Sequence, residues 1–225
     1  LGRVNPDDLI GVATYFQRAP LARPRQVDLD CTRPDRPARY VISGTSQLWV
    51  RELSSTEARP LPNTEGAIVP FWSPDSRFIG FFAEGRLKKT DVAGRTVQVV
   101  CEAPDGRGGA WSRKGFILFA PASVGPLMRV SESGGAVTAA TRLDSTLGET
   151  AQRFPSLLAD GERFVYIALG DSFGARVGLP GGSSRQIQLA LSGAPVWAPG
   201  DYLVFPREGA LMAQRFDPAS GRVRG

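Results

Sequence analysis

The chain has 225 residues, enough for one sizeable all-β domain or two small domains. Its net charge of +5 comes almost entirely from arginines scattered along the sequence, which favours solvated strand faces and argues against nucleic-acid binding. The sequence contains no histidine, which excludes Ser-His-Asp and Cys-His catalysis and histidine-ligated metal sites within these residues.

Residues 1–36 are expected to form an irregular lead-in to a repeated domain. Asn5 and Pro6 can begin a short helix that extends to Tyr15. The stretches 9–16 and 25–29 have enough apolar character to serve as strands. The lead-in is therefore a possible source of a closing strand for the domain that follows.

Five repeats follow, at about residues 37–69, 70–108, 109–151, 152–194 and 195–225. Each of the last four opens with an aromatic residue, a polar turn and a short apolar run; the aromatic residues are Trp72, Trp111, Phe154 and Trp197. Pro74 presets the backbone of its turn, and the Asp75 and Asp160 side chains can accept hydrogen bonds from nearby backbone donors. A large aromatic before each turn is suited to filling the space between neighbouring sheets.

A second element recurs in step with the first. It places a leucine at an equivalent point of four repeats, and these leucines are Leu48, Leu87, Leu127 and Leu211. A turn and a third strand-like stretch follow each copy, whereas the element is degenerate around Ala175–Leu179 in the fourth repeat. A period of about 40 residues that contains three or four short strands is typical of a propeller blade. The sequence therefore predicts an all-β fold, a β-propeller of five to six blades, each a three- or four-stranded antiparallel sheet, with an incomplete ring as one outcome.

Closure of this ring is an open question. The last repeat stops at Gly225, before it has enough residues for all four strands, and an unpaired strand edge invites aggregation. Part of residues 9–30 is expected to complete or cover the last blade, with Arg25–Leu29 favoured as the strand. The competing outcome is an open, truncated ring whose remaining blades lie beyond Gly225.

The amino-acid sequences of the repeats resemble those of a known family. The turn at Trp72–Asp75 and its following strand look like the repeat of TolB-type propellers, which are cousins of the WD-repeat propellers. A closer similarity is to the propeller that follows the kinase domain and membrane helix of many bacterial serine/threonine protein kinases. That similarity rests on Gln47–Leu53, Thr64–Ala67, Phe71–Leu87, Gly106–Trp111 and Glu208–Gln214. It implies an extracytoplasmic domain, periplasmic or at the cell surface, linked through one helix to a kinase.

Two features depart from that resemblance. Residues 1–38 do not look like the family's first blade. The family also tends to carry a histidine near Gln152, after a Gly-Glu-Thr triplet that is matched here by Gly148–Thr150. Any role of that histidine is absent from this chain.

No catalytic or metal site is predicted. The chain lacks the kinase motifs and the Gly-x-Ser-x-Gly elbow of hydrolases, and Cys31 and Cys101 are too far apart in sequence for metal-ligand spacing. Whether these two cysteines form a disulfide is left open. Three residues are weak ligand-binding candidates: Arg107, whose neighbouring glycines could form an anion-binding nest, and Glu149 and Arg153, which could reach the central channel or its rim.

The sequence therefore predicts a non-catalytic binding or sensor module with no cofactor, no nucleic-acid partner and no membrane insertion by this segment. The first hypothesis is the extracytoplasmic domain of a serine/threonine kinase that senses a protein, peptide or small extracellular ligand. The alternatives are a periplasmic TolB-type interaction scaffold and the gating propeller of a prolyl-oligopeptidase-like serine peptidase. Nothing in the loops selects one class of ligand.

Overall fold

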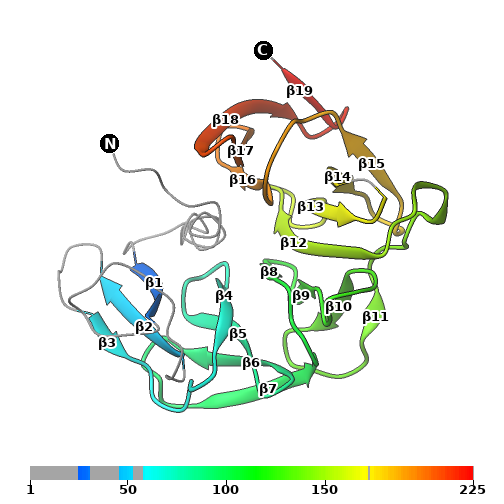
Figure 1. The fold of residues 1–225 in the computed structure, drawn as a ribbon. Helices are drawn as coiled ribbons and strands as arrows, with labels where there is room; N and C mark the ends of the chain where they lie inside the picture. The colour runs from blue at the N-terminus through cyan, green and yellow to red at the C-terminus, as the bar shows by residue number, and fades with distance from the viewer. Residues whose placement is uncertain (1–24, 31–45, 53–57, 172, 225) are drawn as a thin grey trace.

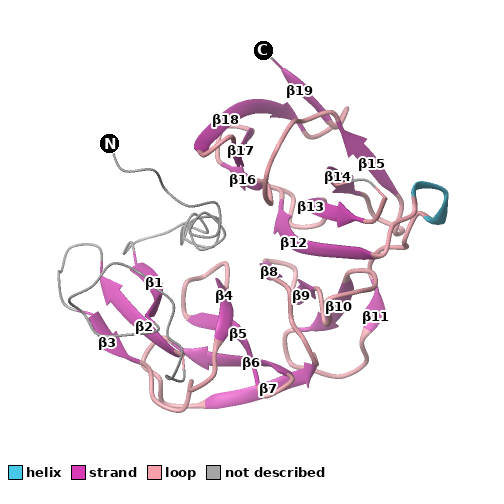
Figure 2. Cartoon of the chain, viewed as in Figure 1, coloured by secondary structure: helices cyan, strands magenta, loops and turns pink. Residues whose placement is uncertain are grey.

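The computed structural model describes residues 25–30, 46–52, 58–171 and 173–224, which form five antiparallel sheets arranged along an arc (Figure 1). In this part of the chain the one helical element is a 3₁₀ turn, η1, at Ser145–Leu147, and the rest is strand and loop (Figure 2). The strands in chain order are β1 (Arg25–Asp30), β2 (Gln47–Glu52), β3 (Ala58–Pro60), β4 (Ile68–Trp72), β5 (Phe78–Ala83), β6 (Arg86–Asp91), β7 (Val97–Glu102), β8 (Gly109–Ser112), β9 (Phe116–Phe119), β10 (Met128–Ser131), β11 (Thr138–Ala139), β12 (Ala151–Leu157), β13 (Phe164–Leu169), β14 (Gly174–Gly178), β15 (Ser184–Ile187), β16 (Val196–Ala198), β17 (Tyr202–Arg207), β18 (Ala210–Asp217) and β19 (Arg222–Arg224).

Each sheet is a meander whose strands pair in sequence order. The first sheet is β1-β2-β3, and the other four contain β4–β7, β8–β11, β12–β15 and β16–β19. The first strands of neighbouring four-stranded sheets contact one another along the inside of the arc: β4 contacts β8, β8 contacts β12, and β12 contacts β16. This radial arrangement is the predicted β-propeller, and four of the sheets begin within about two residues of the repeat starts expected from the sequence period.

The three repeated tryptophans occupy equivalent register positions. Trp72 lies opposite Ile79, Trp111 opposite Ile117 and Trp197 opposite Leu203, in each case near the end of the first strand. Each indole packs against the preceding sheet: Trp72 lies in the apolar cluster with Leu48, and Trp111 in the cluster with Phe71. Trp72 and Trp111 are buried, whereas Trp197 is half-buried. The interpretation of these tryptophans as fillers between successive sheets is thus confirmed for the first two and holds in part for the third.

Phe154 is not the counterpart of the tryptophans. The residue at that register position in the fourth sheet is Leu157, which lies opposite Phe164. Phe154 instead corresponds to Val69: both have positive φ, 52° and 47°, and both sit in a β-bulge of the first strand. The sequence analysis equated Phe154 with the tryptophans because all four residues are aromatic. The strand register instead depends on how many residues separate a position from the turn that follows it. Asp75 and Asp160 agree with the register, since their Oδ1 atoms accept from the backbone N–H groups of Arg77 and Glu162 at 3.1 and 2.9 Å.

The repeated leucines differ according to whether a further sheet follows. Leu48, Leu87 and Leu127 are fully buried and pack against the next sheet. Leu211 holds the same register position, opposite Pro206, but it is 43% exposed. The prediction that Leu211 is a buried anchor is therefore wrong. The physical reason is that, among the described residues, no sheet packs on the far side of the last one.

The predicted closure by the lead-in is also wrong for the part that can be judged. Arg25–Asp30 is a strand, but it pairs along its whole length with β2 of the first sheet, so the first sheet begins before residue 37. The last sheet needs no added strand, because β16 and β19 have only three residues each and four strands fit between Val196 and Arg224. No described strand joins the first sheet to the last, which matches the open ring. The expected helix near Tyr15 and the stretch 9–24 lie outside the described residues.

Candidate functional site

One end of the propeller gathers loops from several sheets. In an antiparallel meander the start of the first strand lies beside the end of the second. Here Asp105 N–H donates to the Pro121 carbonyl at 3.0 Å, and Gly125 N–H donates to the Thr150 carbonyl at 2.8 Å. We call this end, made by residues 103–108, 120–127 and 140–150, the loop face.

Arg107 is held on the loop face by its own backbone. Its N–H donates to the Ala120 carbonyl at 2.9 Å, and its Nη2 donates to Asp105 Oδ2 at 2.8 Å. The glycines on either side serve packing, because a Cβ on Gly106 would lie 2.1 Å from the Phe82 ring and one on Gly108 would lie 2.7 Å from the Phe154 Cα. The backbone donor of Arg107 is thus already used, so this residue can recognise an anion through its side chain and not through the backbone nest considered from the sequence.

Arg153, on β12, lies beside the loop that carries Arg107. The Arg107 carbonyl accepts from Phe154 N–H at 3.0 Å, and Arg153 Nη2 donates to the Ser123 carbonyl. A hydrogen bond from Arg107 lowers the pKa of Asp105 against the opposing effect of burial, and Ser123 and Arg153 lower it further. The side chains of Arg107 and Asp105 are 40% and 41% exposed. The structure therefore brings two arginines and one carboxylate together at a solvent-accessible point of the loop face, with one net positive charge.

Glu149 does not share this location. Its side chain is 2% exposed and forms an ion pair with Arg176 of β14, which is itself 8% exposed. Its Oε2 accepts from Asp144 N–H at 3.0 Å and from Gln152 Nε2 at 2.9 Å. A buried carboxylate needs such partners to offset its desolvation. The proposal that Glu149 reaches the channel or rim is wrong: its buried ion pair with Arg176 of β14 fixes residues 140–150 to the fourth sheet.

Gln152 belongs to the same buried network. It is 1% exposed, its Nε2 also donates to the Arg142 carbonyl at 2.9 Å, and its Oε1 accepts from Thr141 Oγ1. The position where the resemblance implies a histidine is thus filled by an amide whose donor and acceptor are both used. Nearby Tyr166 is fully buried, and this burial raises the pKa of its hydroxyl from 10.0 to about 12.

The one described cysteine has little reactive character. Cys101 carries a free thiol that packs half-buried against the cluster of the second and third sheets. Burial raises the pKa of Cys101 from 9.0 to about 11, which keeps the thiol protonated near neutral pH. Cys31 lies outside the described residues. Within the described ranges no group of three or more Asp, Glu and Cys side chains is arranged to hold a metal ion.

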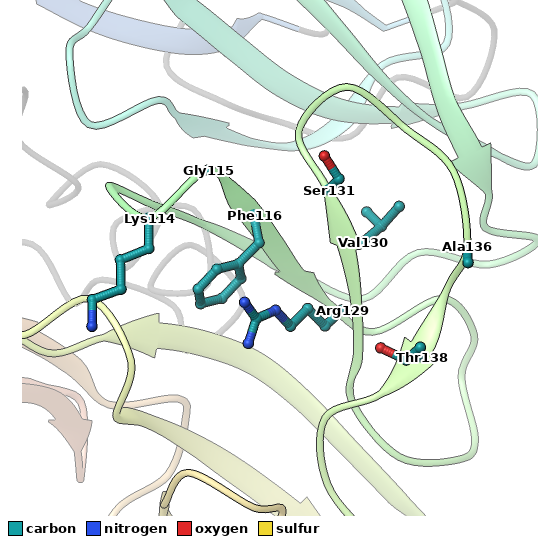
Figure 3. A pocket seen from close by; sticks show the side chains of 8 residues that line it. All are labelled: Lys114, Gly115, Phe116, Arg129, Val130, Ser131, Ala136 and Thr138. Carbon is teal, nitrogen blue, oxygen red and sulfur yellow. The ribbon is translucent and has the colours of Figure 1, made fainter.

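A second polar feature escaped the sequence analysis. A pocket of about 250 Å³ lies on the third sheet, and we call it the third-sheet pocket (Figure 3). Its side chains come from the turn before β9 and from β9, β10 and β11, and the main ones are Lys114, Phe116, Arg129, Ser131 and Thr138. The available signal was the alternation in β10, where buried Val130 is flanked by exposed Arg129 and Ser131.

None of the helices that the structure describes is long and apolar enough to span a membrane.

Comparisons with known proteins identify the fold. No protein-family model matches the chain, and no curated protein matches it. Among solved structures, a chain of the nidogen/laminin complex is similar with a TM-score of 0.60 at 13% identity, over 80% of this chain and 71% of that one. A TolB from Agrobacterium tumefaciens is similar with a TM-score of 0.54 at 15% identity, over 73% and 60% of the two chains. The acylaminoacyl peptidase of Pyrococcus horikoshii is similar with a TM-score of 0.56 at 14% identity, over 92% of this chain but 38% of the peptidase. The chain thus spans less than two thirds of the latter two proteins, and these similarities establish the propeller fold.

Proposed function

We propose that this chain, a β-propeller with a TolB-like fold, is a non-catalytic binding or sensing module that takes its ligand at the loop face. The observation that carries the proposal is the group formed by Arg107, Asp105 and Arg153. The partly exposed side chains of Arg107, in the loop before β8, and of Arg153, on β12, offer planar donors to an acidic group of a protein, peptide or small molecule. Loops on a rigid propeller are a common place for such recognition.

We assign the module to the extracytoplasmic part of a bacterial serine/threonine protein kinase. The support is the amino-acid sequence of the repeats, which resembles that of the propellers of such kinases, above all over Phe71–Leu87 and Glu208–Gln214. A ligand bound outside the membrane would be reported to the kinase through a single helix. The parent gene tests this assignment, because a kinase domain and one membrane helix must be encoded before Leu1. Their absence would refute the kinase role and leave the binding module intact.

Two other contexts are compatible with the fold. A TolB-type scaffold predicts a signal peptide and a small separate N-terminal domain in the parent protein. A gating propeller of a serine peptidase predicts an α/β-hydrolase domain on the same polypeptide that supplies the catalytic triad. The similarity to TolB and to acylaminoacyl peptidase supports these as the alternatives, and the flanking coding sequence distinguishes all three.

Binding at the loop face can be tested with a fluorescein-labelled tri-glutamate peptide, measured by fluorescence anisotropy. Charge-assisted hydrogen bonds contribute about 1.5–3 kcal/mol, so Arg107→Gln and Arg153→Gln should each weaken binding at least about tenfold. The matched control is Arg95→Gln, which removes the same charge from an arginine that is 79% exposed at the opposite end of the second sheet. Equal losses in all three variants, or none, would refute the loop face as the site.

A further inference from the structure

We propose that the third-sheet pocket is a second binding site, independent of the loop face, that takes the carboxylate group of a small organic acid or of a peptide terminus. The third-sheet pocket lies at the turn end of β8 and β9, whereas Arg107 precedes β8 at its other end. The two sites can therefore be occupied and tested separately.

The central group of the third-sheet pocket is Arg129. Its guanidinium carbon lies 3.7 Å from the centre of the Phe116 ring, which is buried, and Figure 3 shows the guanidinium beside that ring. The Phe116 ring holds one face of the planar guanidinium group. The N–H donors point outward from the edge of that group, where they can form two parallel hydrogen bonds with a carboxylate. Within the described part of the chain, the side chain of Arg129 forms no hydrogen bond and no ion pair, and its one interaction is with the Phe116 ring. Its donors are thus oriented and available.

The register places polar partners on the same side of the sheet. Arg129 lies between Leu118 and Thr138 in neighbouring strands, and Phe116 lies opposite Ser131. Directly paired residues of an antiparallel sheet point to the same face. Ser131 and Thr138 therefore lie on the same face of the sheet as Arg129, and in Figure 3 the Thr138 hydroxyl is directed towards the Arg129 side chain. The Ser131 hydroxyl lies farther away and pairs with Ser133 Oγ at 2.8 Å.

The equivalent position in the second sheet is occupied by a cation that links two sheets, and it can be compared with Arg129. Lys89 has the register of Arg129, and Phe78 has that of Phe116. Lys89 Nζ lies 5.9 Å from the Trp111 ring and donates to the Glu132 carbonyl at 2.7 Å, so it joins the second sheet to the third. Arg129 makes no such bond to the fourth sheet. Its cation is therefore not used in holding two sheets together, which leaves ligand binding as its chemical capacity.

Charge and size select the ligand class. Lys114 Nζ forms an ion pair with Glu162 Oε1 at 2.8 Å, so Arg129 is the one charged side chain lining the third-sheet pocket that has no ion pair among the described residues. The Glu132 carboxylate lies beside Gly115 at the edge of the pocket, where its Oε2 accepts from Trp111 Nε1 at 2.7 Å. One uncompensated positive charge matches a carboxylate better than the nearly double charge of a phosphate. A volume of about 250 Å³ is below the range of about 300–1,000 Å³ that is typical of drug-sized ligands. The pocket suits a small acid or one terminal group of a larger partner.

The experiment is a titration of the isotope-labelled chain, followed by amide chemical shifts, with glutarate, with a tripeptide bearing a free or an amidated C-terminus, and with inorganic phosphate. Glutarate should shift amides of β9, β10 and β11, and Arg129→Gln should weaken its binding by about 10- to 100-fold, the range expected for losing a charged hydrogen bond. Arg77→Gln removes the same charge from an exposed arginine in the corresponding turn region of the second sheet and should change nothing. Because Arg129 is exposed and its side chain contacts only the Phe116 ring, the melting temperature of Arg129→Gln should stay within about 3 °C of that of the parent chain.

The outcomes separate the two sources of the carboxylate and the opposing explanations. Binding of glutarate but not of the tripeptide identifies a free small acid, and loss of tripeptide binding on amidation identifies a peptide terminus. Tighter binding of phosphate than of any carboxylate would overturn the ligand class. The proposal fails if Arg129→Gln binds like the parent chain, if Arg77→Gln loses as much, or if no carboxylate shifts the amides around the pocket. These results do not depend on Arg107 or Arg153, so the loop face can fail or succeed on its own test.

Discussion

Truncation of Trp111 is the most direct test of how the sheets support one another. The indole of Trp111 is 7% exposed, and its ring centre lies 6.4 Å from that of Phe71 and 6.2 Å from that of Phe78 in the preceding sheet. Its Nε1 donates to Glu132 Oε2 at 2.7 Å. Trp111→Ala therefore removes an aromatic wedge between the second and third sheets together with one hydrogen bond.

The magnitude follows from the buried area. A buried tryptophan removes about 150–250 Å² from water, and about 25 cal/mol for each Å² gives roughly 4–6 kcal/mol as an upper value. Alanine retains a small part of that area, and truncations of large core aromatics typically cost about 3–5 kcal/mol. We expect Trp111→Ala to lower the free energy of unfolding by about 3–5 kcal/mol. Trp111→Phe should lose much less, since it retains most of the apolar contact and gives up the bond to Glu132.

The assay is urea unfolding followed by far-UV circular dichroism, with Trp197→Ala as the matched control. Trp197 has the same register position but is only half-buried, so its truncation should cost less than that of Trp111. Since each sheet rests on its neighbours, amide hydrogen exchange should also accelerate in the second sheet of Trp111→Ala. An unchanged urea midpoint for Trp111→Ala would show that the wedge does not hold the two sheets together, and the packing argument would be wrong.

Three further predictions concern stability. Leu87→Ala should cost about 2–5 kcal/mol in urea unfolding, whereas Leu211→Ala at the same register position should cost well under half of that, because Leu87 is fully buried and Leu211 is 43% exposed; equal losses would contradict the assignment of the last sheet's open face. Glu149→Gln should cost about 3–5 kcal/mol because it leaves the buried Arg176 charge unpaired, and adding Arg176→Met should recover part of that loss; a near-neutral Glu149→Gln would mean that water reaches the pair. Since burial raises the pKa of Tyr166 from 10.0 to about 12, the folded state favours the protonated hydroxyl, and this contribution to stability is present below pH 10 and is lost as the pH rises towards 12; Tyr166→Phe should flatten that alkaline decline, and an unchanged pH profile would contradict it.

The sequence determined the features that depend on one repeat. A polar turn and the apolar run after it specify a strand, a turn and a strand within a dozen residues, and this local pattern located Trp72, Trp111 and the starts of four sheets. The same reasoning misplaced Phe154, because residue type and distance from the turn disagree there and only backbone pairing decides between them. The composition, with no histidine, also removed histidine-dependent catalysis from this chain before any fold was known.

Tertiary structure decided everything that depends on which sheet lies next to which. Leu87 and Leu211 carry the same local pattern, yet one is buried and the other exposed, since burial depends on whether a following sheet covers the residue. The sequence allowed β1 to pair with the first sheet or with the last sheet, and in the structure it pairs with β2 of the first sheet. Glu149 and Arg176 are 27 positions apart in the printed sequence, and only the fold brings them together as a buried ion pair. Lys89 and Arg129 have equivalent register positions, yet Lys89 links two sheets whereas the Arg129 side chain contacts only the Phe116 ring. No local sequence pattern encodes these partners. A repeat sequence specifies each blade through short-range contacts, whereas its sites arise from side chains that only the stacking of blades brings together.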